Sequence, residues 1–463
     1  MYGLIGMVAM ALGVAAAEDS VYRFASLAIV AFGLILLFDG HVLVLVLLLG
    51  SLTVDLGRLS PSLEFFVQVQ KATVLGYFLA AALRGRFRLN MATAPLVALG
   101  LLLGSTLFYA TPLEGVTGAQ RAQSLITLSA GWLVISVARY SESERLRLLA
   151  VLAWLAPVSV MLGVVLWPVE GAPFASDAGS GLRLQGASYA AYLGAYATYG
   201  IGAYICARAD GLQRGAGRTS LMIVNAAILL MTLGRGPLIA CGILAAPSVR
   251  LVWRAGRWRP SLWLISRYSL IFGGILGLFV YLPVVLNRTQ GESTADSSSG
   301  RTEAWNYFIS VADVNRLFGR GIGAGPIAGQ YGPPLIKTNF TGQHNEYVRF
   351  FLESGWIGSI IFWFALLVAA IMLVSTVPRR YRPHVAALFV AFLVFSLTDN
   401  TISSLELFLT FSVLVSCYPT GGAAETRSHV SGSAAVPRPW DFSTTTDVGP
   451  RGYLGTRGAQ TPS

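Results

Sequence analysis

Charged residues are scarce in this chain of 463 residues, and lysine is almost absent. Only 12% of the residues are charged, whereas the hydrophobic set AVILMFWYC makes up 54%. Soluble globular domains carry about 25% charged residues, so this composition excludes an ordinary soluble protein. Lysine occurs only as Lys71 and Lys337, and every other side-chain cation apart from histidine is an arginine.

Cysteine is also scarce, with three residues that all lie in or beside apolar runs: Cys206, Cys241 and Cys417. This usage predicts small buried side chains and neither a disulfide framework nor a zinc motif. The formal net charge of +11 comes from arginines that are dispersed between apolar segments. Nucleic-acid-binding domains gather their cations on one soluble surface, so nucleic acid is not an expected partner.

Apolar runs of a length suited to crossing a bilayer, about 20 residues each, recur along the chain. We place them near 1–17, 24–38, 41–54, 63–83, 93–110, 124–139, 148–167, 187–206, 219–234, 237–252, 268–286, 355–377, 385–397 and 405–418. Several runs are short, and neighbours such as 24–38 and 41–54 can merge, so we expect roughly 12–14 transmembrane helices. The sequence therefore predicts an all-α polytopic membrane protein.

The arginines of the short loops predict the orientation of the helices, because such loops face the cytoplasm when they are rich in arginine. One alternating set of loops is arginine-rich, near residues 84–88, 139–147, 208–218, 250–259 and 379–382. The opposite loops, including 168–186 and the long stretch 287–344, are then expected outside. We divide the chain into N-terminal transmembrane helices at 1–218, a second membrane region at 219–418, and a disordered cytoplasmic tail at 419–463.

Three arginines lie at unusual positions on the predicted outer side: Arg183, Arg235 and Arg301. Each alone could anchor a helix at the level of the lipid headgroups. As a set they suggest a binding site, because the positive-inside rule disfavours them there and a planar guanidinium grips phosphate oxygens in bidentate fashion. A lipid-linked phosphate or diphosphate is the expected ligand.

His344 is the only histidine that we expect on the outer side, and it opens the stretch His344-Asn345-Glu346-Tyr347-Val348-Arg349. A neutral imidazole can take a proton from a sugar hydroxyl, although a loop histidine taken alone is more often structural than catalytic. The stretch should be helical from His344 to Gly355. Arg349 and Glu353 lie one helical turn apart and should form an ion pair.

Two further features of the outer side carry open interpretations. Asp399 and Asn400 lie at a predicted outer turn, where they could orient the histidine or an acceptor sugar; we favour the alternative that they cap a helix. The glycine-rich run 321–325 lacks the strand and the Lys-Ser/Thr of a nucleotide loop, so we interpret it as a tight turn. The nearby acidic residues are too scattered for a metal site, so no metal and no cofactor is expected.

Four motifs in order resemble those of the O-antigen ligase and O-antigen polymerase family. The resemblance covers roughly residues 220–375 and rests on these segments: Gly234-Arg235-Gly236; Gly300-Arg301-Thr302-Glu303-Ala304-Trp305; Leu317-Phe318-Gly319-Arg320-Gly321-Ile322-Gly323; and His344-Asn345 followed by Tyr347 and Glu353-x-Gly355. The match at Arg183 is weaker, because Ala187-Ser188-Tyr189-Ala190 stands where the family often has an Asn-Pro-Asn-like segment.

The resemblance implies a bacterial inner-membrane, multi-pass glycosyltransferase of GT-C-like fold, with its active site facing the periplasm. Residues 219–418 would form the O-antigen ligase-like region, with a large periplasmic loop at 287–344 that contains short helices. Arg235, Arg301 and Arg183 would bind the diphosphate of an undecaprenyl-diphosphate-linked glycan, and His344 would deprotonate the acceptor hydroxyl in a metal-independent, inverting reaction. The supporting residues would be Asn345, Tyr347, Glu353, Trp305 and Asp399.

The acceptor stays open at this point. Lipid A–core would make the protein an O-antigen ligase, which the long loop favours, and a growing lipid-linked polysaccharide would make it an O-antigen or exopolysaccharide polymerase. A lipid-linked oligosaccharide transporter would also show many helices and intramembrane cations. It would be expected to show inverted repeats, and no internal repeat is visible in the sequence.

Overall fold

The computed structural model describes residues 41–55, 65–84, 93–138, 140–170, 174–177, 181–209, 216–254, 301–334, 336 and 343–419. The predicted spans at 1–17, 24–38 and 268–286 lie outside these residues, as does the predicted tail beyond residue 419. The loop 287–344 is described only from residue 301, with gaps.

The described residues are mainly helical, as predicted. The first helices are α3 (His41–Ser51), α5 (Phe65–Leu83), α6 (Ala94–Phe108), α7 (Gly118–Val137), α8 (Glu142–Val165) and α9 (Trp167–Glu170). After the strands β1 (Phe174–Asp177) and β2 (Gly181–Leu184) come α10 (Ala190–Ala209), α11 (Ala216–Met231) and α12 (Arg235–Arg254). The last are α14 (Arg301–Ala312), η3 (Asp313–Asn315), α15 (Ala324–Gln330), α17 (Glu346–Thr376), α18 (Arg382–Ser396) and α19 (Leu405–Ser416).

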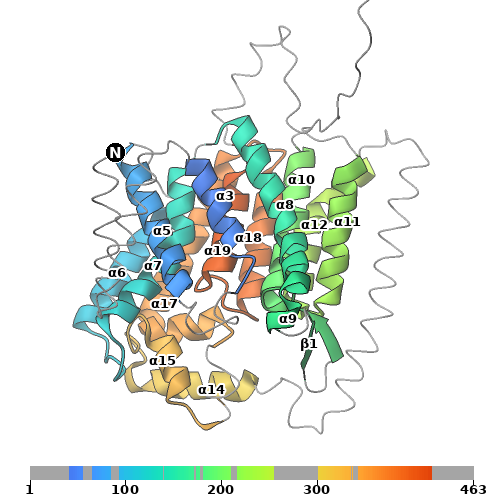
Figure 1. The fold of residues 1–463 in the computed structure, drawn as a ribbon. Helices are drawn as coiled ribbons and strands as arrows, with labels where there is room; N and C mark the ends of the chain where they lie inside the picture. Colours follow the sequence, from blue (N-terminus) through green and yellow to red (C-terminus); the bar gives the residue numbers. More distant parts are fainter. Residues whose placement is uncertain are drawn as a thin grey trace, which may run out of the picture. The chain divides into compact units, whose positions relative to one another are not determined.

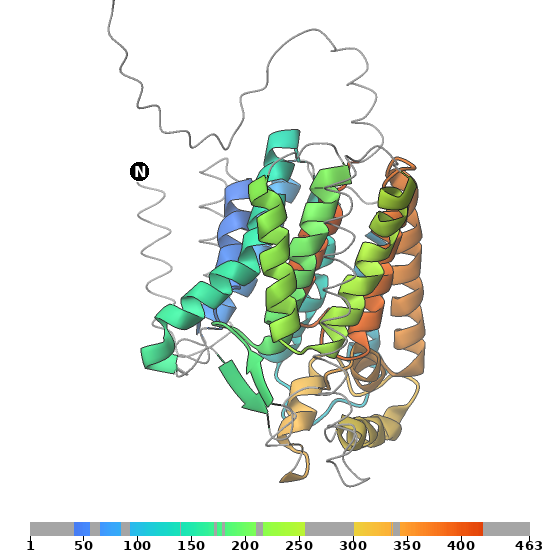
Figure 2. The same cartoon turned by 90° about the vertical axis from the view of Figure 1, so that its right-hand side faces the viewer.

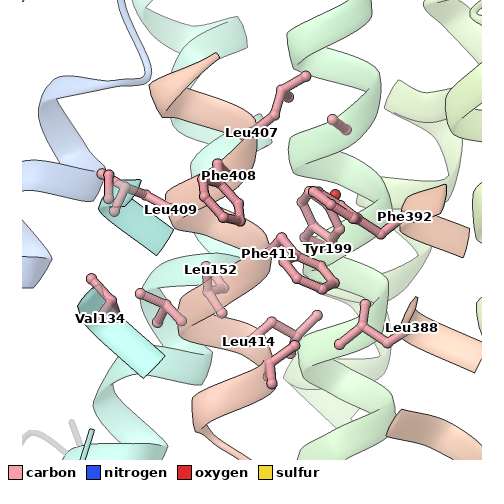
Figure 3. Packing of buried hydrophobic residues seen from close by; sticks show 14 of the residues in the cluster. Val134, Leu152, Tyr199, Leu388, Phe392, Leu407, Phe408, Leu409, Phe411 and Leu414 are labelled. Carbon is pink, nitrogen blue, oxygen red and sulfur yellow. The ribbon is translucent and has the colours of Figure 1, made fainter. Parts of the chain in front are cut away.

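The core of the bundle forms around α19, which packs against α7, α8, α10 and α18 (Figure 1). Aromatic side chains dominate these contacts: Phe392 of α18 stacks on Phe411 of α19, with ring centroids 4.0 Å apart. Phe408 of α19 meets Trp132 of α7 edge to face. Figure 3 shows how Phe392, Phe408 and Phe411 interlock with Tyr199 of α10. Offset-stacked and edge-to-face pairs add to the energy of apolar burial, so these helices are held in one register.

Two described helices, α8 and α17, are long and apolar enough to cross a bilayer on their own. Six shorter apolar helices accompany them, and large apolar side chains of α17 such as Ile360, Phe364 and Ile371 are exposed on its surface. These features agree with an all-α membrane protein, while the number of 12–14 spans stays a prediction.

A short antiparallel hairpin, formed by β1 and β2, was not predicted. The two strands are only four residues each, too short for a clear alternation of polar and apolar residues in the sequence. The hairpin lies within the predicted outer stretch 168–186. Its strand β2 carries Arg183.

The predicted outer segments meet at one end of the bundle. Figures 1 and 2 both show β1, α14 and α15 at the end where α17 begins. Arg301 of α14 contacts the turn between α18 and α19, and Arg183 contacts the turn between α11 and α12. Segments that are far apart in the sequence therefore build one surface.

Candidate functional site

His344 lies just before α17, in a backbone conformation that side chains rarely adopt. Its φ is 46°, and helix α17 begins at Glu346, two residues after the position that the sequence predicts. Asn345 is the N-cap: its side-chain oxygen accepts hydrogen bonds from the backbone N–H groups of Tyr347 (2.9 Å) and Val348 (3.2 Å). This cap fixes the start of α17 and holds His344 outside the helix.

Asp399 faces the imidazole of His344. Its Oδ1 atom lies 3.6 Å from His344 Nδ1, and the carboxylate is buried whereas 36% of the histidine side chain is exposed. The predicted capping role of Asp399 is wrong, because the N-cap of α19 is Ser404. The alternative role, orientation of the histidine, stays a prediction; it is compatible with the 3.6 Å between Asp399 Oδ1 and His344 Nδ1.

Helix α14 contacts both sides of this pair. Arg301 Nη1 donates a hydrogen bond to the carbonyl of Thr398 (3.0 Å), next to Asp399. Trp305 Nε1 donates to the carbonyl of Gln343 (2.9 Å), next to His344. Arg301 and Trp305 lie one helical turn apart on the same face of α14, which explains the four-residue spacing of the second motif.

Arg235 is the first residue of α12 and is exposed. The following Gly236 packs against the same turn between α18 and α19, since a Cβ at this position would lie 2.9 Å from Phe395 Cδ2 and would also meet the hydroxyl of Thr398. Only glycine permits this approach. It brings the start of α12 to the residue whose carbonyl binds Arg301.

Arg183 reaches the site from the hairpin. Its Nε atom donates a hydrogen bond to the carbonyl of Thr232 (3.0 Å), in the turn that leads into α12. The turn is strained at Leu233, which has a φ of 51°. The three predicted arginines are thus linked through two turns, 232–235 and 397–404, to the segment that carries His344.

The glycine-rich third motif is a scaffold for this site. Gly319, Gly321 and Gly323 all have positive φ values, which confirms the predicted tight turn. Arg320 N–H donates to the carbonyl of Leu352 (2.8 Å) and Gly321 N–H to that of Glu353 (2.9 Å). The segment therefore pairs with α17 just before its kink at Gly355, where φ is 62° and ψ is −166°.

Glu353 is buried and Tyr347 is half-buried, and both contact neighbouring helices. The predicted pair of Glu353 with Arg349 is confirmed, with Nε and Oε1 separated by 3.2 Å, and Glu353 Oε1 also accepts from Gly325 N–H of α15. Tyr347 stacks on Trp363, with centroids 4.3 Å apart, and its hydroxyl donates to the carbonyl of Leu393. Both residues support α17.

Arg316, another arginine of the predicted loop, has a different environment. Its guanidinium forms two 2.8 Å hydrogen bonds with Asp313 on the surface. These bonds raise the pKa of Arg316 above its ordinary value. Because its charge is already matched by a carboxylate, Arg316 is not assigned to the site.

Glu346 is a residue of this region that the sequence analysis did not single out. Its side chain is fully buried, and Oε1 accepts three hydrogen bonds from Ile402 and Ser403. An acidic residue in the first turn of a helix normally interacts with the helix dipole, so the sequence offered no signal for a long-range role.

The described residues include no group of three or more His, Cys, Asp or Glu side chains arranged to hold a metal ion. The groups that the structure places next to one another are the Arg301 guanidinium, which binds the Thr398 carbonyl, and the His344 imidazole, which faces the Asp399 carboxylate. In general a guanidinium can bind an anion of the phosphate class and an imidazole can move a proton.

Comparison with known proteins agrees with the four motifs. Residues 220–363 match the family model described as O-Antigen ligase, close to the region of resemblance predicted from the sequence. No curated protein matches the chain. The matched region contains Arg235, Arg301, Trp305, His344 and Glu353. Residues 220–363 are therefore similar to the O-antigen ligase domain, and the resemblance to the O-antigen ligase and O-antigen polymerase family that the motifs predicted is confirmed over this region.

Proposed function

We propose that this protein is an inner-membrane glycosyltransferase that moves a glycan from undecaprenyl diphosphate to an acceptor hydroxyl at the periplasmic face. The acceptor that we propose is lipid A–core, so the reaction is O-antigen ligation. The observation that carries the proposal is the turn between α18 and α19, where adjacent residues contact a guanidinium and an imidazole: Thr398 binds Arg301 and Asp399 faces His344.

The arginines bind the donor in this mechanism. Arg235 and Arg301, with Arg183 beside them, hold the diphosphate that links the glycan to the lipid. A guanidinium matches two phosphate oxygens at once and keeps its charge at any physiological pH. As the bond between the anomeric carbon and the diphosphate oxygen breaks, the same cations stabilise the charge on the leaving group.

His344 acts as the general base. It takes the proton from the acceptor hydroxyl while that oxygen forms a bond to the anomeric carbon, on the side opposite the leaving diphosphate. The configuration at this carbon is therefore inverted. Asp399 orients the ring and stabilises the imidazolium that forms, as a carboxylate does in other acid–base pairs.

The remaining residues of the motifs support the site. Asn345 caps α17 beside His344, Trp305 holds the backbone at Gln343, and Glu353 ties α17 to α15. Tyr347 anchors α17 to α18. Because the arginines supply the positive charge, the reaction needs no metal ion.

A purified-protein assay tests the chemistry. The wild-type protein should transfer glycan from a lipid-linked donor to lipid A–core, and His344→Ala should lower the rate by about 10²–10⁴-fold, the usual contribution of a general base. His429→Ala, at a histidine outside the family match, is the control and should leave the rate unchanged. A His344→Ala protein with wild-type rate would disprove the assigned role, and transport of the donor without covalent transfer would indicate a transporter.

Deletion of the gene in its host tests the acceptor. Loss of long glycans from lipid A, together with their accumulation on undecaprenyl diphosphate, is expected for a ligase. Lipid A that carries at most one repeat, or lost exopolysaccharide with intact lipopolysaccharide, would instead assign the protein as a polymerase. Gels of lipopolysaccharide and of lipid-linked glycans, run side by side, distinguish these outcomes.

A further inference from the structure

Glu346 is a buried carboxylate at the first position of α17, two residues after His344. Its Oε1 atom accepts hydrogen bonds from Ile402 N–H (2.8 Å), Ser403 N–H (2.7 Å) and the Ser403 hydroxyl (2.8 Å). Its Oε2 atom is buried and has no hydrogen-bond partner among the described residues. A carboxylate bears the cost of such burial only where its hydrogen bonds are good, so these three bonds hold it in one position.

The three hydrogen bonds that Glu346 accepts come from the turn between α18 and α19, residues 397–404. The other end of this turn bears the contacts to the site: Thr398 accepts the hydrogen bond of Arg301, and Asp399 faces His344. The start of α12 packs on the same turn through Gly236. One turn thus positions groups from three other segments of the chain.

The turn joins the end of α18 at Ser396 to the start of α19 at Leu405. Its first residues bond back to α18, as Asp399 N–H does to the Phe395 carbonyl (3.1 Å), and Ser404 N–H donates to the Asn400 carbonyl (3.1 Å). The backbone N–H groups of Ile402 and Ser403 precede α19 and would otherwise lack a partner in the protein interior. Glu346 satisfies both of them with one oxygen.

We infer that Glu346 is a positioning residue for glycan transfer: it fixes the 397–404 turn relative to the start of α17, and thereby sets the distance between His344 and Asp399. This inference rests on the proposed function. Glu346 itself contacts no reacting group. It acts through the turn. Glu346 lies at the start of α17 and His344 just before it, and Glu346 binds the turn that contains Asp399, the residue that faces His344.

The first test is Glu346→Gln, which keeps the shape of the side chain and removes its charge. We expect kcat for glycan transfer to fall about tenfold, since charge-assisted hydrogen bonds are roughly twice as strong as neutral ones. In the His344→Ala background the same substitution should cause no further loss of kcat. A merely structural effect would lower kcat by the same factor in the wild-type and the His344→Ala backgrounds. Glu303→Gln is the matched control: Glu303 also follows a site residue, Arg301, by two positions, but it is exposed, and kcat should not change.

A second variant covers the case in which Glu346→Gln does not fold. Ser403→Ala removes one of the three donors and keeps both backbone N–H groups, so it should fold and lower kcat by about two- to threefold. If either variant folds and transfers glycan at the wild-type rate, the positioning role is wrong.

Hydrogen exchange separates this inference from the proposed function. In the full-length protein, amides of residues 397–404 should exchange faster in Glu346→Gln than in wild type, whether or not any glycan is transferred. If wild type transfers no glycan but exchange in the turn rises in the variant, the proposed function fails and the contact stands. If exchange is unchanged in the variant, Glu346 does not hold the turn and the inference is overturned.

Discussion

Gly319 and Gly355 meet backbone to backbone: a Cβ on Gly319 would lie 2.6 Å from the backbone nitrogen of Gly355. Both residues have positive φ values, 74° and 62°. With ψ at −166°, Gly355 occupies a region that is essentially restricted to glycine. Directly after Gly355, the N–H of Trp356 donates a hydrogen bond to the carbonyl of Arg316 (2.8 Å), which adds a second link between the same two segments. The third and fourth motifs of the sequence therefore pack against each other at Gly319 and Gly355. This contact sets the angle between the two parts of α17.

We predict that Gly319→Ala destabilises the protein by roughly 3 kcal/mol or more, because the added methyl group meets backbone atoms that cannot move aside and the left-handed conformation is strained for alanine. Thermal unfolding of the purified protein in detergent measures the effect. Gly104→Ala is the control. Gly104 lies in α6 with no atom within 4 Å of its Cβ position, so alanine should be neutral or stabilise the helix by up to about 1 kcal/mol. Equal melting temperatures of the two variants would show that Gly319 and Gly355 do not pack against each other as described.

The ion pair of Arg349 and Glu353 gives the second prediction. Both side chains are buried, so Arg349→Met leaves the carboxylate of Glu353 without its cation in the protein interior. We expect a loss of about 3–5 kcal/mol in the free energy of unfolding, as for other broken buried pairs. Arg316→Met breaks an exposed pair that water and salt screen, so it should lower the free energy of unfolding far less than Arg349→Met does. Chemical denaturation of both variants measures the difference, and a stable Arg349→Met protein would contradict the role of the pair.

Much of the helical layout was predictable from the sequence. The apolar runs 93–110, 355–377 and 405–418 correspond to α6, the second part of α17 and α19. Such local signals depend on composition over one helix, which the sequence displays directly. The spacing of Arg301 and Trp305 was also visible, because both lie on one face of one helix.

The long-range relationships were not predictable in the same way. The contacts of His344 with Asp399 and of Glu346 with Ser403 depend on how α17 packs against α18 and α19. No local pattern encodes this packing. An aspartate in a turn looks the same in the sequence whether it caps a helix or faces a histidine. The sequence therefore favoured the commoner role of Asp399, a helix cap, and this prediction was wrong.

The relation of Asp399 to His344 gives the third prediction. Asp399→Asn keeps the size of the side chain but removes the charge that stabilises an imidazolium, so kcat should fall by about 10–100-fold, less than the loss in His344→Ala. Asp313→Asn is the control, because Asp313 pairs with Arg316 on the surface, and its kcat should match wild type. Steady-state kinetics with saturating donor measure kcat for both variants and for wild type. An unchanged kcat in Asp399→Asn would remove Asp399 from the mechanism.

Metal independence gives the fourth prediction. The charge that develops on the leaving diphosphate is met by arginines in the proposed mechanism, so a chelator such as EDTA should leave the rate of transfer unchanged. The assay compares protein before and after exhaustive dialysis against the chelator, and then after addition of Mg²⁺ or Mn²⁺. A rate that falls on dialysis and returns with the cation would show that a metal shares the task of the arginines.

The fifth prediction concerns the donor site. Arg301→Lys keeps a positive charge but loses the planar fork of donors, which in the structure reaches the carbonyl of Thr398 and in the mechanism grips the diphosphate. We expect KM for the lipid-linked donor to rise about tenfold, because a lysine binds phosphate as a point charge and not in bidentate fashion. The inhibition constant of an isoprenyl diphosphate that carries no glycan should rise by the same factor, since this ligand shares only the lipid and the diphosphate with the donor. Arg316→Lys should change neither value. A rise in KM without a rise in the inhibition constant would mean that Arg301 contacts the glycan and not the diphosphate.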